Sequence, residues 1–149
     1  MLPFLKCANG FWLKKISGTF TSPIMKTREA IISNYIAGYN SFDTSRMLAD
    51  VSNDVVFENI SQGTSTMRLE GLEALRQQAE QAKALFTERE QCITGFHHND
   101  DTTEIGITYK ATLAMDLPNG LKKGDVLELK GRSVFSFSEH TITAITDIS

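Results

Sequence analysis

The chain has 149 residues with a formal net charge of −3, and 41% of its residues are hydrophobic and 22% are charged. These values predict one globular domain and exclude disordered, collagen-like and coiled-coil proteins. No basic cluster indicates a nucleic-acid surface, and no apolar run approaches the roughly 18 residues that a membrane span needs. We therefore expect neither nucleic acid nor a membrane among its partners.

The first 24 residues differ from the rest of the chain. Pro3, Gly10, Gly18 and Pro23 interrupt any regular pattern, and the lysines are misplaced for a secretory signal peptide. The pattern favours an N-terminal extension over 1–24 and a folded domain over 25–149.

The first half of the remainder alternates helices with one strand. Ile32, Tyr35 and Tyr39 recur at helical spacing, and Val55, Phe57 and Asn59 alternate on one face of a strand. The predicted segments are a helix over 27–40, a short helix over 43–48, a turn at 53–54, a strand over 55–60, a loop over 61–65 and a helix over 71–86.

The second half changes to a period of two, which indicates strands. Tyr109 lies in the second of these strands and Met115 at its end, and Ser133 and Phe135 lie in the third. The predicted strands cover 88–96, 105–115, 126–138 and 141–149. Helices segregated from a run of antiparallel strands are typical of an α+β fold.

Several of these segments carry a resemblance to a known family. They are Tyr35-Ile36-Ala37-Gly38-Tyr39-Asn40, Met47-Leu48-Ala49-Asp50, Val55-Val56-Phe57-Glu58, Leu69 to Arg76, and the strand from Gly131 to Phe137. Together they resemble the nuclear transport factor 2-like superfamily, and within it the SnoaL-like group of small polyketide cyclases and ketosteroid isomerase relatives.

The resemblance implies a particular architecture. Its members form a cone-shaped α+β barrel, with three N-terminal helices packed on a strongly curved, mainly antiparallel sheet and an apolar cavity between them. Many of them dimerise through the outer face of the sheet. We therefore expect a homodimer, in which Val126, Val134, Ile142 and Ile148 lie on that outer face.

The resemblance also shows which residues of this sequence stand at the catalytic positions of ketosteroid isomerase. The mechanism of that enzyme needs a carboxylate base and two acids that bind the enolate oxygen. Tyr35 matches the tyrosine donor, but Asn59 stands at the base position and Ser133 at the second acid. An amide cannot abstract a proton, and a serine hydroxyl is a poor acid. This activity is therefore not expected.

Asp147 is the remaining candidate for acid–base chemistry. Counting back from the turn at 139–140 places Ile145 and Asp147 on the concave face, where apolar walls would raise the pKa of a carboxyl. A turn one residue longer or shorter would reverse this facing. The alternative is a solvated carboxylate near the C-terminus.

Two functions of different class follow. The first is cofactor-free acid–base catalysis of the cyclase, isomerase or dehydratase type on a small hydrophobic molecule, with Asp147 and Tyr35 as catalytic groups. The expected ligand-binding residues are Tyr39, Phe57, Asn59, Tyr109, Met115, Ser133 and Phe135. The alternative is a non-catalytic ligand-binding or protein-interaction domain.

The sequence contains no recognisable motif for binding a metal or a cofactor. His97 and His98 are adjacent on a strand end and would point in opposite directions, and Cys7 and Cys92 lack metal-ligand spacing. Two cysteines also do not make a disulfide framework, which favours a reducing, cytoplasmic location. We expect no cofactor and no metal.

Overall fold

The computed structural model describes residues 23–149, which form three helices and six strands. The extension expected over 1–24 lies outside this range apart from Pro23 and Ile24, which begin the first helix. The elements are α2 (Pro23–Asn40), α3 (Thr44–Met47), β1 (Val51–Ser61), β2 (Thr64–Glu70), α4 (Leu72–Lys83), β3 (Phe86–His98), β4 (Thr102–Leu113), β5 (Val126–Ser138) and β6 (Thr141–Ile148).

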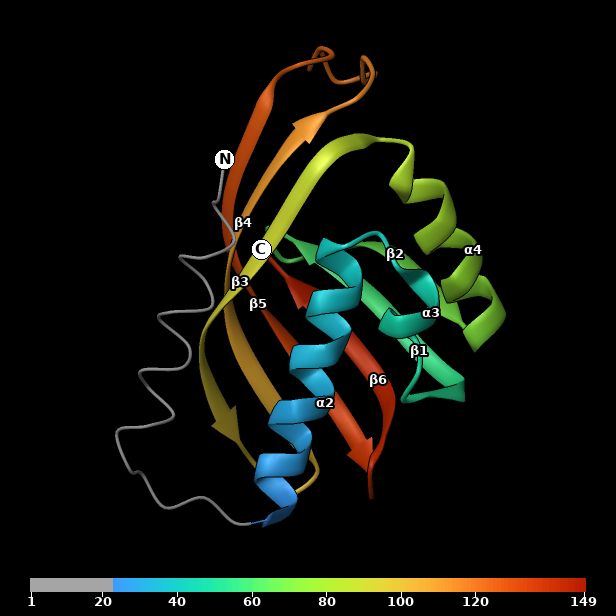
Figure 1. The fold of residues 1–149 in the computed structure, drawn as a ribbon, viewed down its shortest axis with the longest axis vertical. Coiled ribbons are helices and arrows are strands. Elements are labelled where there is room, and N and C mark those ends of the chain that lie inside the picture. Colours follow the sequence, from blue (N-terminus) through green and yellow to red (C-terminus); the bar gives the residue numbers. More distant parts are fainter. Residues whose placement is uncertain (1–22) are drawn as a thin grey trace.

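The six strands make one mixed sheet in the order β2-β1-β6-β5-β4-β3. All neighbours are antiparallel except β1 and β6, which are parallel. The sheet is curled but not closed, α2 lies across it, and β4 and β5 continue past the other strands as a long arm (Figure 1). The predicted α+β fold of the cone-shaped type is confirmed.

Glycines lie at an irregular point and at a close backbone approach in the sheet. Gly95 of β3 is paired with Gly106 of β4, beside an irregularity in the strand register. A Cβ added to Gly131 of β5 would lie 2.7 Å from the carbonyl oxygen of Ile148. Close approach of the backbones at Gly131 therefore requires the absence of a side chain.

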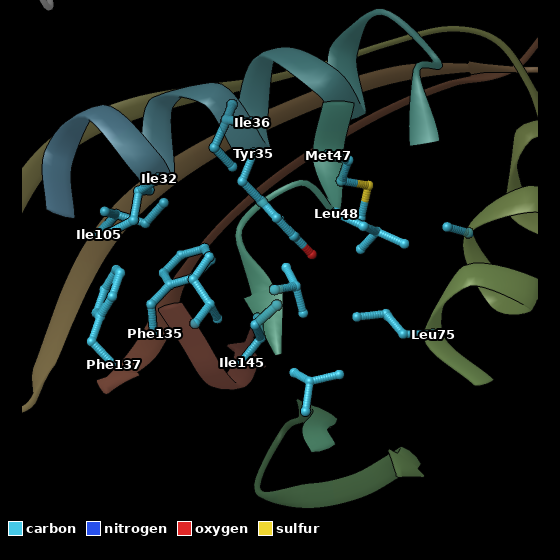
Figure 2. Packing of buried hydrophobic residues seen from close by; sticks show 14 of the residues in the cluster. Ile32, Tyr35, Ile36, Met47, Leu48, Leu75, Ile105, Phe135, Phe137 and Ile145 are labelled. Atoms are coloured by element: carbon cyan, nitrogen blue, oxygen red, sulfur yellow. The ribbon is translucent and has the colours of Figure 1, made fainter. Parts of the chain in front are cut away.

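The core lies between the sheet and the helices α2, α3 and α4, and it includes a tightly packed region under the first half of α2 (Figure 2). Phe135 is 0% exposed and meets the Tyr35 ring edge-on, with ring centroids 5.3 Å apart. Ile32, Ile105 and Phe137 complete this region, which we call the packed end.

Polar contacts fasten the start of α2 to the packed end. Arg28 donates from Nη2 to the carbonyl of Asp100 at 2.6 Å and from Nη1 to the carbonyl of Asn99 at 2.9 Å. Beside it, His98 Nε2 lies 2.8 Å from Glu29 Oε2 and His98 Nδ1 lies 2.9 Å from Thr103 Oγ1. The strand ends and the helix start are therefore held in one arrangement.

The other end of α2 is fixed to the edge strand β3. The Asn40 side chain accepts from the backbone N–H of Gln91 at 2.7 Å and donates to the Gln91 carbonyl at 3.0 Å. In the adjoining corner, a Cβ on Gly38 would collide with the backbone nitrogen of Met47. These two features set the position of the last turn of α2 against the sheet.

The structure corrects the predicted elements in three places. Residues 53–54 lie inside β1 rather than in a turn, and the expected loop at 61–65 contains the start of β2, which the sequence pattern missed. Phe86, expected on the last helix, begins β3. The loop and turn residues there belong to a tight β1–β2 hairpin closed by Gln62 and Gly63.

The expected outer face of the sheet is also corrected at one position. Ile142 is buried in the core rather than on the outer face. The register of β5 and β6 shifts between Ser136 and Phe137, so that Ile142 pairs with Phe137 and Ile145 with Phe135. This irregularity turns both isoleucines inward.

Candidate functional site

Three polar residues form a row across the concave face of the sheet. Asn59 of β1 pairs with Asp147 of β6, and Asp147 pairs with Ser133 of β5. Residues that pair directly share a face of the sheet. The row therefore faces the helices, in line with the alternation predicted for Val55, Phe57 and Asn59.

Asp147 is held by Ser133. Ser133 is 2% exposed, and its hydroxyl donates to Asp147 Oδ1 at 2.5 Å. Burial raises the pKa of the Asp147 carboxyl above its ordinary value, and the hydrogen bond from Ser133 acts in the opposite sense. A carboxyl of this kind exchanges a proton more readily near neutral pH than a solvated one.

Two adjoining cavities meet at this row, and Tyr39, Asn59, Gln91 and Asp147 line both. The helix-side cavity has a volume of about 230 Å³ and lies under α2 and α4. Its other lining residues are Tyr35, Met47, Phe57, Met67, Leu75, Gln78, Ala79 and Ala82. The strand-side cavity has a volume of about 250 Å³ and is lined further by Ile107, Tyr109, Leu129 to Ser133, Ile148 and Ser149.

Both cavities are mainly apolar with a few polar groups, which is the usual composition of a small-molecule site. Asp147 is the only carboxylic acid side chain among the lining residues of the two cavities. Carboxylates are common general bases, so Asp147 is the candidate base among these lining residues.

Tyrosine hydroxyls provide the donors around Asp147. The hydroxyls of Tyr39 and Tyr109 lie 2.9 Å apart. The Tyr35 ring projects from α2 into the space between the helices and the sheet (Figure 2), and its hydroxyl has no hydrogen-bond partner in residues 23–149. Burial raises the pKa of all three phenols, so they remain protonated donors.

The structure brings most of the predicted site residues together. Tyr35, Tyr39, Phe57, Asn59 and Asp147 line the helix-side cavity, and Tyr109 and Ser133 line the strand-side cavity. Their roles in binding or catalysis stay predictions.

Met115 and Phe135 do not line these cavities, and their expected place is corrected. Met115 lies beyond the end of β4 and is 43% exposed. Phe135 is on the concave face but packs under Tyr35 in the core. An inward-facing residue thus reaches a cavity only where no other side chain covers it.

Two residues of β3 were not predicted as part of the site. Gln91 lines both cavities, and Arg89, two residues earlier, lies under the last turn of α2 with its Nε 2.9 Å from the Tyr39 carbonyl. Arg89 and Gln91 follow the same two-residue alternation in β3 as Ile93, which packs against the core. This alternation was the available signal in the sequence, but it does not by itself show which residues of the strand reach a cavity.

The expectation of reduced cysteines is not supported. Cys92 of β3 is disulfide-bonded, and the other cysteine of the sequence, Cys7, lies outside the described residues. The cytoplasmic location therefore stays a prediction without support from cysteine chemistry. No helix of residues 23–149 is long and apolar enough to cross a membrane, and no group of metal-ligating side chains occurs in that range.

Solved structures of similar fold come from several bacteria. A proposed polyketide cyclase of Xanthomonas campestris pv. campestris aligns at 20% identity and a TM-score of 0.70, covering 83% of this chain and 90% of that one. A proposed SnoaL-like polyketide cyclase of Jannaschia sp. CCS1 aligns at 10% identity and a TM-score of 0.71, covering 87% and 90%. IdmH, a proposed polyketide cyclase of Streptomyces antibioticus, aligns at 13% identity and a TM-score of 0.66, covering 81% and 90%. At these identities the likeness shows the fold alone.

The sequence itself gives a family. No curated protein matches it. The family model described as the SnoaL-like domain matches residues 32–145, which include α2 from Ile32 onward and all six strands up to Ile145 of β6. This chain therefore belongs to the SnoaL-like domain family.

Proposed function

We propose that this protein binds a small, largely apolar molecule in the two cavities and moves a proton on it with Asp147, without a cofactor. The observation that carries the proposal is the Asp147 carboxyl, bonded to Ser133 at 2.5 Å and enclosed by mainly apolar walls. Reactions of the cyclase, isomerase or dehydratase type need such a group.

The proposed chemistry begins with a carbonyl compound. Asp147 takes the proton from a carbon next to the carbonyl, and the electron pair of that C–H bond moves onto the carbonyl oxygen as an enolate. A tyrosine hydroxyl donates to this oxygen as its charge develops. In a conjugated enolate the proton then returns to a different carbon; alternatively, the enolate carbon forms a carbon–carbon bond to a second carbonyl, whose oxygen receives the proton.

The assignment of roles departs from steroid isomerase. Asn59 donates from Nδ2 to Thr66 Oγ1 at 2.8 Å, which gives its amide a local bonding role. Ser133 is engaged as a donor to Asp147. Neither supplies an acid or a base, so the proposed base is Asp147 and the proposed donors are tyrosines.

The decisive experiment follows hydrogen exchange at carbon. We expect 2-tetralone, an enolisable apolar ketone, to exchange its α-protons with D2O faster in the presence of the protein, as measured by NMR. Asp147→Asn should lower this acceleration at least a hundredfold, because general bases contribute about 10²–10⁴-fold. Asp54→Asn, at an exposed aspartate of β1, is the matched control and should leave the rate unchanged.

The alternative is a non-catalytic binding domain. It is favoured by the presence of one carboxyl rather than two in the cavities. Under it, 2-tetralone would bind to the natural protein and to Asp147→Asn with similar Kd, and neither would accelerate exchange. Binding without exchange would replace the catalytic proposal by this one.

A homodimer through the outer sheet face is a further proposal. Val126 is 52% exposed on β5 and Val134 lies on the same face. Sedimentation equilibrium should give a mass of about two chains, and Val134→Glu should lower it toward one. A mass of one chain for the natural protein at all concentrations would exclude the dimer.

A further inference from the structure

Arg89 is a buried cation next to the cavities. It is 6% exposed, on the inner face of β3, and it has no carboxylate partner in residues 23–149. Its guanidinium carbon lies 3.8 Å from the centre of the Tyr39 ring and 4.4 Å from that of Phe42. Its positive charge is therefore not neutralised by an acid.

The surroundings explain how this charge is tolerated. Arg89 Nε donates to the Tyr39 carbonyl at the C-terminal end of α2, where the helix dipole is negative. The two aromatic faces add cation–π attraction. However, Arg89 Nη1 has no hydrogen-bond partner in the described part of the chain, and an orphaned buried donor is costly. The contact with the end of α2 uses only Nε of Arg89, so capping the helix does not explain the rest of the guanidinium.

The Arg89 guanidinium stacks on the ring of Tyr39, which lines the strand-side cavity together with Tyr109. Tyr39 and Tyr109 are hydrogen-bonded to each other at 2.9 Å. Two hydroxyls carry two hydrogens, and the bond between them uses one, so the pair retains one hydrogen for a ligand. The phenol that accepts within the pair becomes a better donor, because hydrogen bonds in a chain polarise one another.

We propose that Arg89 is a positioning residue that holds the Tyr39–Tyr109 pair as a hydrogen-bond donor to a negatively charged ligand oxygen, so that the ligands are enolisable carbonyl compounds or acidic phenols. This inference rests on the proposed function and names its substrate class. The donor to the enolate is then this pair, one helical turn beyond Tyr35, the donor that the family resemblance implies.

Electrostatics at the pair agree with this role. Burial raises the pKa of Tyr39, while its bond to Tyr109 and the Arg89 charge act in the opposite sense. Arg89 also opposes the raised pKa of Tyr109. The same field that makes these phenols less reluctant to ionise stabilises an anionic oxygen bonded to them.

The test compares two ligands that differ in one acidic hydrogen. 4-Nitrophenol has an absorbance that distinguishes phenol from phenolate, and 4-nitroanisole is its methyl ether. We expect the natural protein to bind 4-nitrophenol at least tenfold more tightly, since a hydrogen bond to a charged group is worth about that factor or more. The bound 4-nitrophenol should also show a larger phenolate fraction than the free compound at the same pH.

Variants assign the preference to the proposed residues. Arg89→Gln and Tyr109→Phe should each reduce the preference about tenfold and lower the bound phenolate fraction, while the Kd of 4-nitroanisole stays within twofold. Arg89→Lys retains the cation and should recover part of the preference, although lysine lacks the planar stack. Arg76→Gln, at a partly exposed arginine of α4 paired with Glu73, is the control and should change neither value.

The outcomes separate this inference from the proposed function. Equal affinity of the natural protein for the two ligands, or a preference that survives both Arg89→Gln and Tyr109→Phe, overturns the inference and leaves the proposed function standing. Failure of both ligands and of 2-tetralone to bind overturns the proposed function as well. If Arg89→Gln does not fold, Arg89→Met, which also removes the cation, takes its place, and a phenolate fraction unchanged from the natural protein overturns the role of Arg89.

Discussion

The two ends of α2 lie in different environments. At the packed end, Arg28 holds two backbone carbonyls and both ring nitrogens of His98 have partners. At the other end, which we call the cavity end, the Tyr35 hydroxyl has no partner in residues 23–149 and the Tyr39–Tyr109 pair retains a donor hydrogen.

The difference is one of position, because Arg28 Nε also has no hydrogen-bond partner in residues 23–149, whereas the groups with unused capacity at the cavity end belong to residues that line the cavities. Polar groups whose bonding capacity is filled by the protein stabilise one structure. Groups that keep unused capacity beside a cavity weaken the fold slightly and can recognise a ligand. The packed end should therefore respond to substitution in stability and the cavity end in binding or turnover.

The largest expected effect is at the packed end. Phe135→Ala should lower the free energy of unfolding by about 3–5 kcal/mol, because it removes a fully buried ring. The matched variant Phe57→Ala, whose ring lines the helix-side cavity, should cost about half as much. Urea denaturation measures both, and equal losses would contradict the division into two ends.

Arg28→Met should lower the free energy of unfolding by about 2–3 kcal/mol, because the backbone carbonyls of Asn99 and Asp100 lose a charged donor. Arg46→Met is the control, since the exposed Arg46 bonds only to Asn34 nearby. Hydrogen exchange should quicken at the β3–β4 turn in the first variant. A variant as stable as the natural protein would show that the contact contributes nothing.

Asp147→Asn should act in the opposite direction on stability. The raised pKa of Asp147 in the folded state means that ionising it opposes folding, so stability falls as the pH rises from the unfolded pKa through the folded one. The asparagine amide does not ionise, so Asp147→Asn lacks this cost. We expect its free energy of unfolding to rise by about 0.5–2 kcal/mol at pH 7 and to change little at pH 3. Thermal denaturation at the two pH values measures it, and a loss at pH 7 would show that Asp147 is structural.

The smallest expected effect is at a largely exposed ion pair between two neighbouring strands. Arg132 of β5 and Glu104 of β4 form this ion pair, with 3.1 Å between nitrogen and oxygen. A double-mutant cycle should give a coupling below about 1 kcal/mol, which 1 M salt should reduce further. A larger value would mean that this ion pair contributes to stability in its own right.

The sequence was most informative where one face of an element is continuously buried. The periods of α2, α4 and the long strands predicted these elements, and the family resemblance predicted their arrangement. β2 was missed because Met67 and Leu69 alternate with charged residues on a short edge strand, and edge strands carry weak patterns. Ile142 was misplaced because an irregular register changes the phase of β6.

The site was predictable only in part for a related reason. Alternation indicated that Asn59, Ser133 and Asp147 face inward, but it does not say which inward residues another side chain covers. Phe135 is covered by Tyr35, whereas Asp147 is not. Arg89 depends on contacts with the end of α2, 50 residues away in the chain. Such long-range packing leaves no local signature in one sequence.

The bonds between Asn40 and Gln91 have a consequence for how molecules of this protein meet in solution. β3 is an outermost strand of an open sheet, and an outermost strand offers unpaired N–H and C=O groups to any extended chain. Asn40 occupies both groups of Gln91, at the middle of that strand, as a neighbouring strand would. One side chain thus protects the sheet against strand-by-strand growth into aggregates, while the sheet stays open enough to leave room for the cavities.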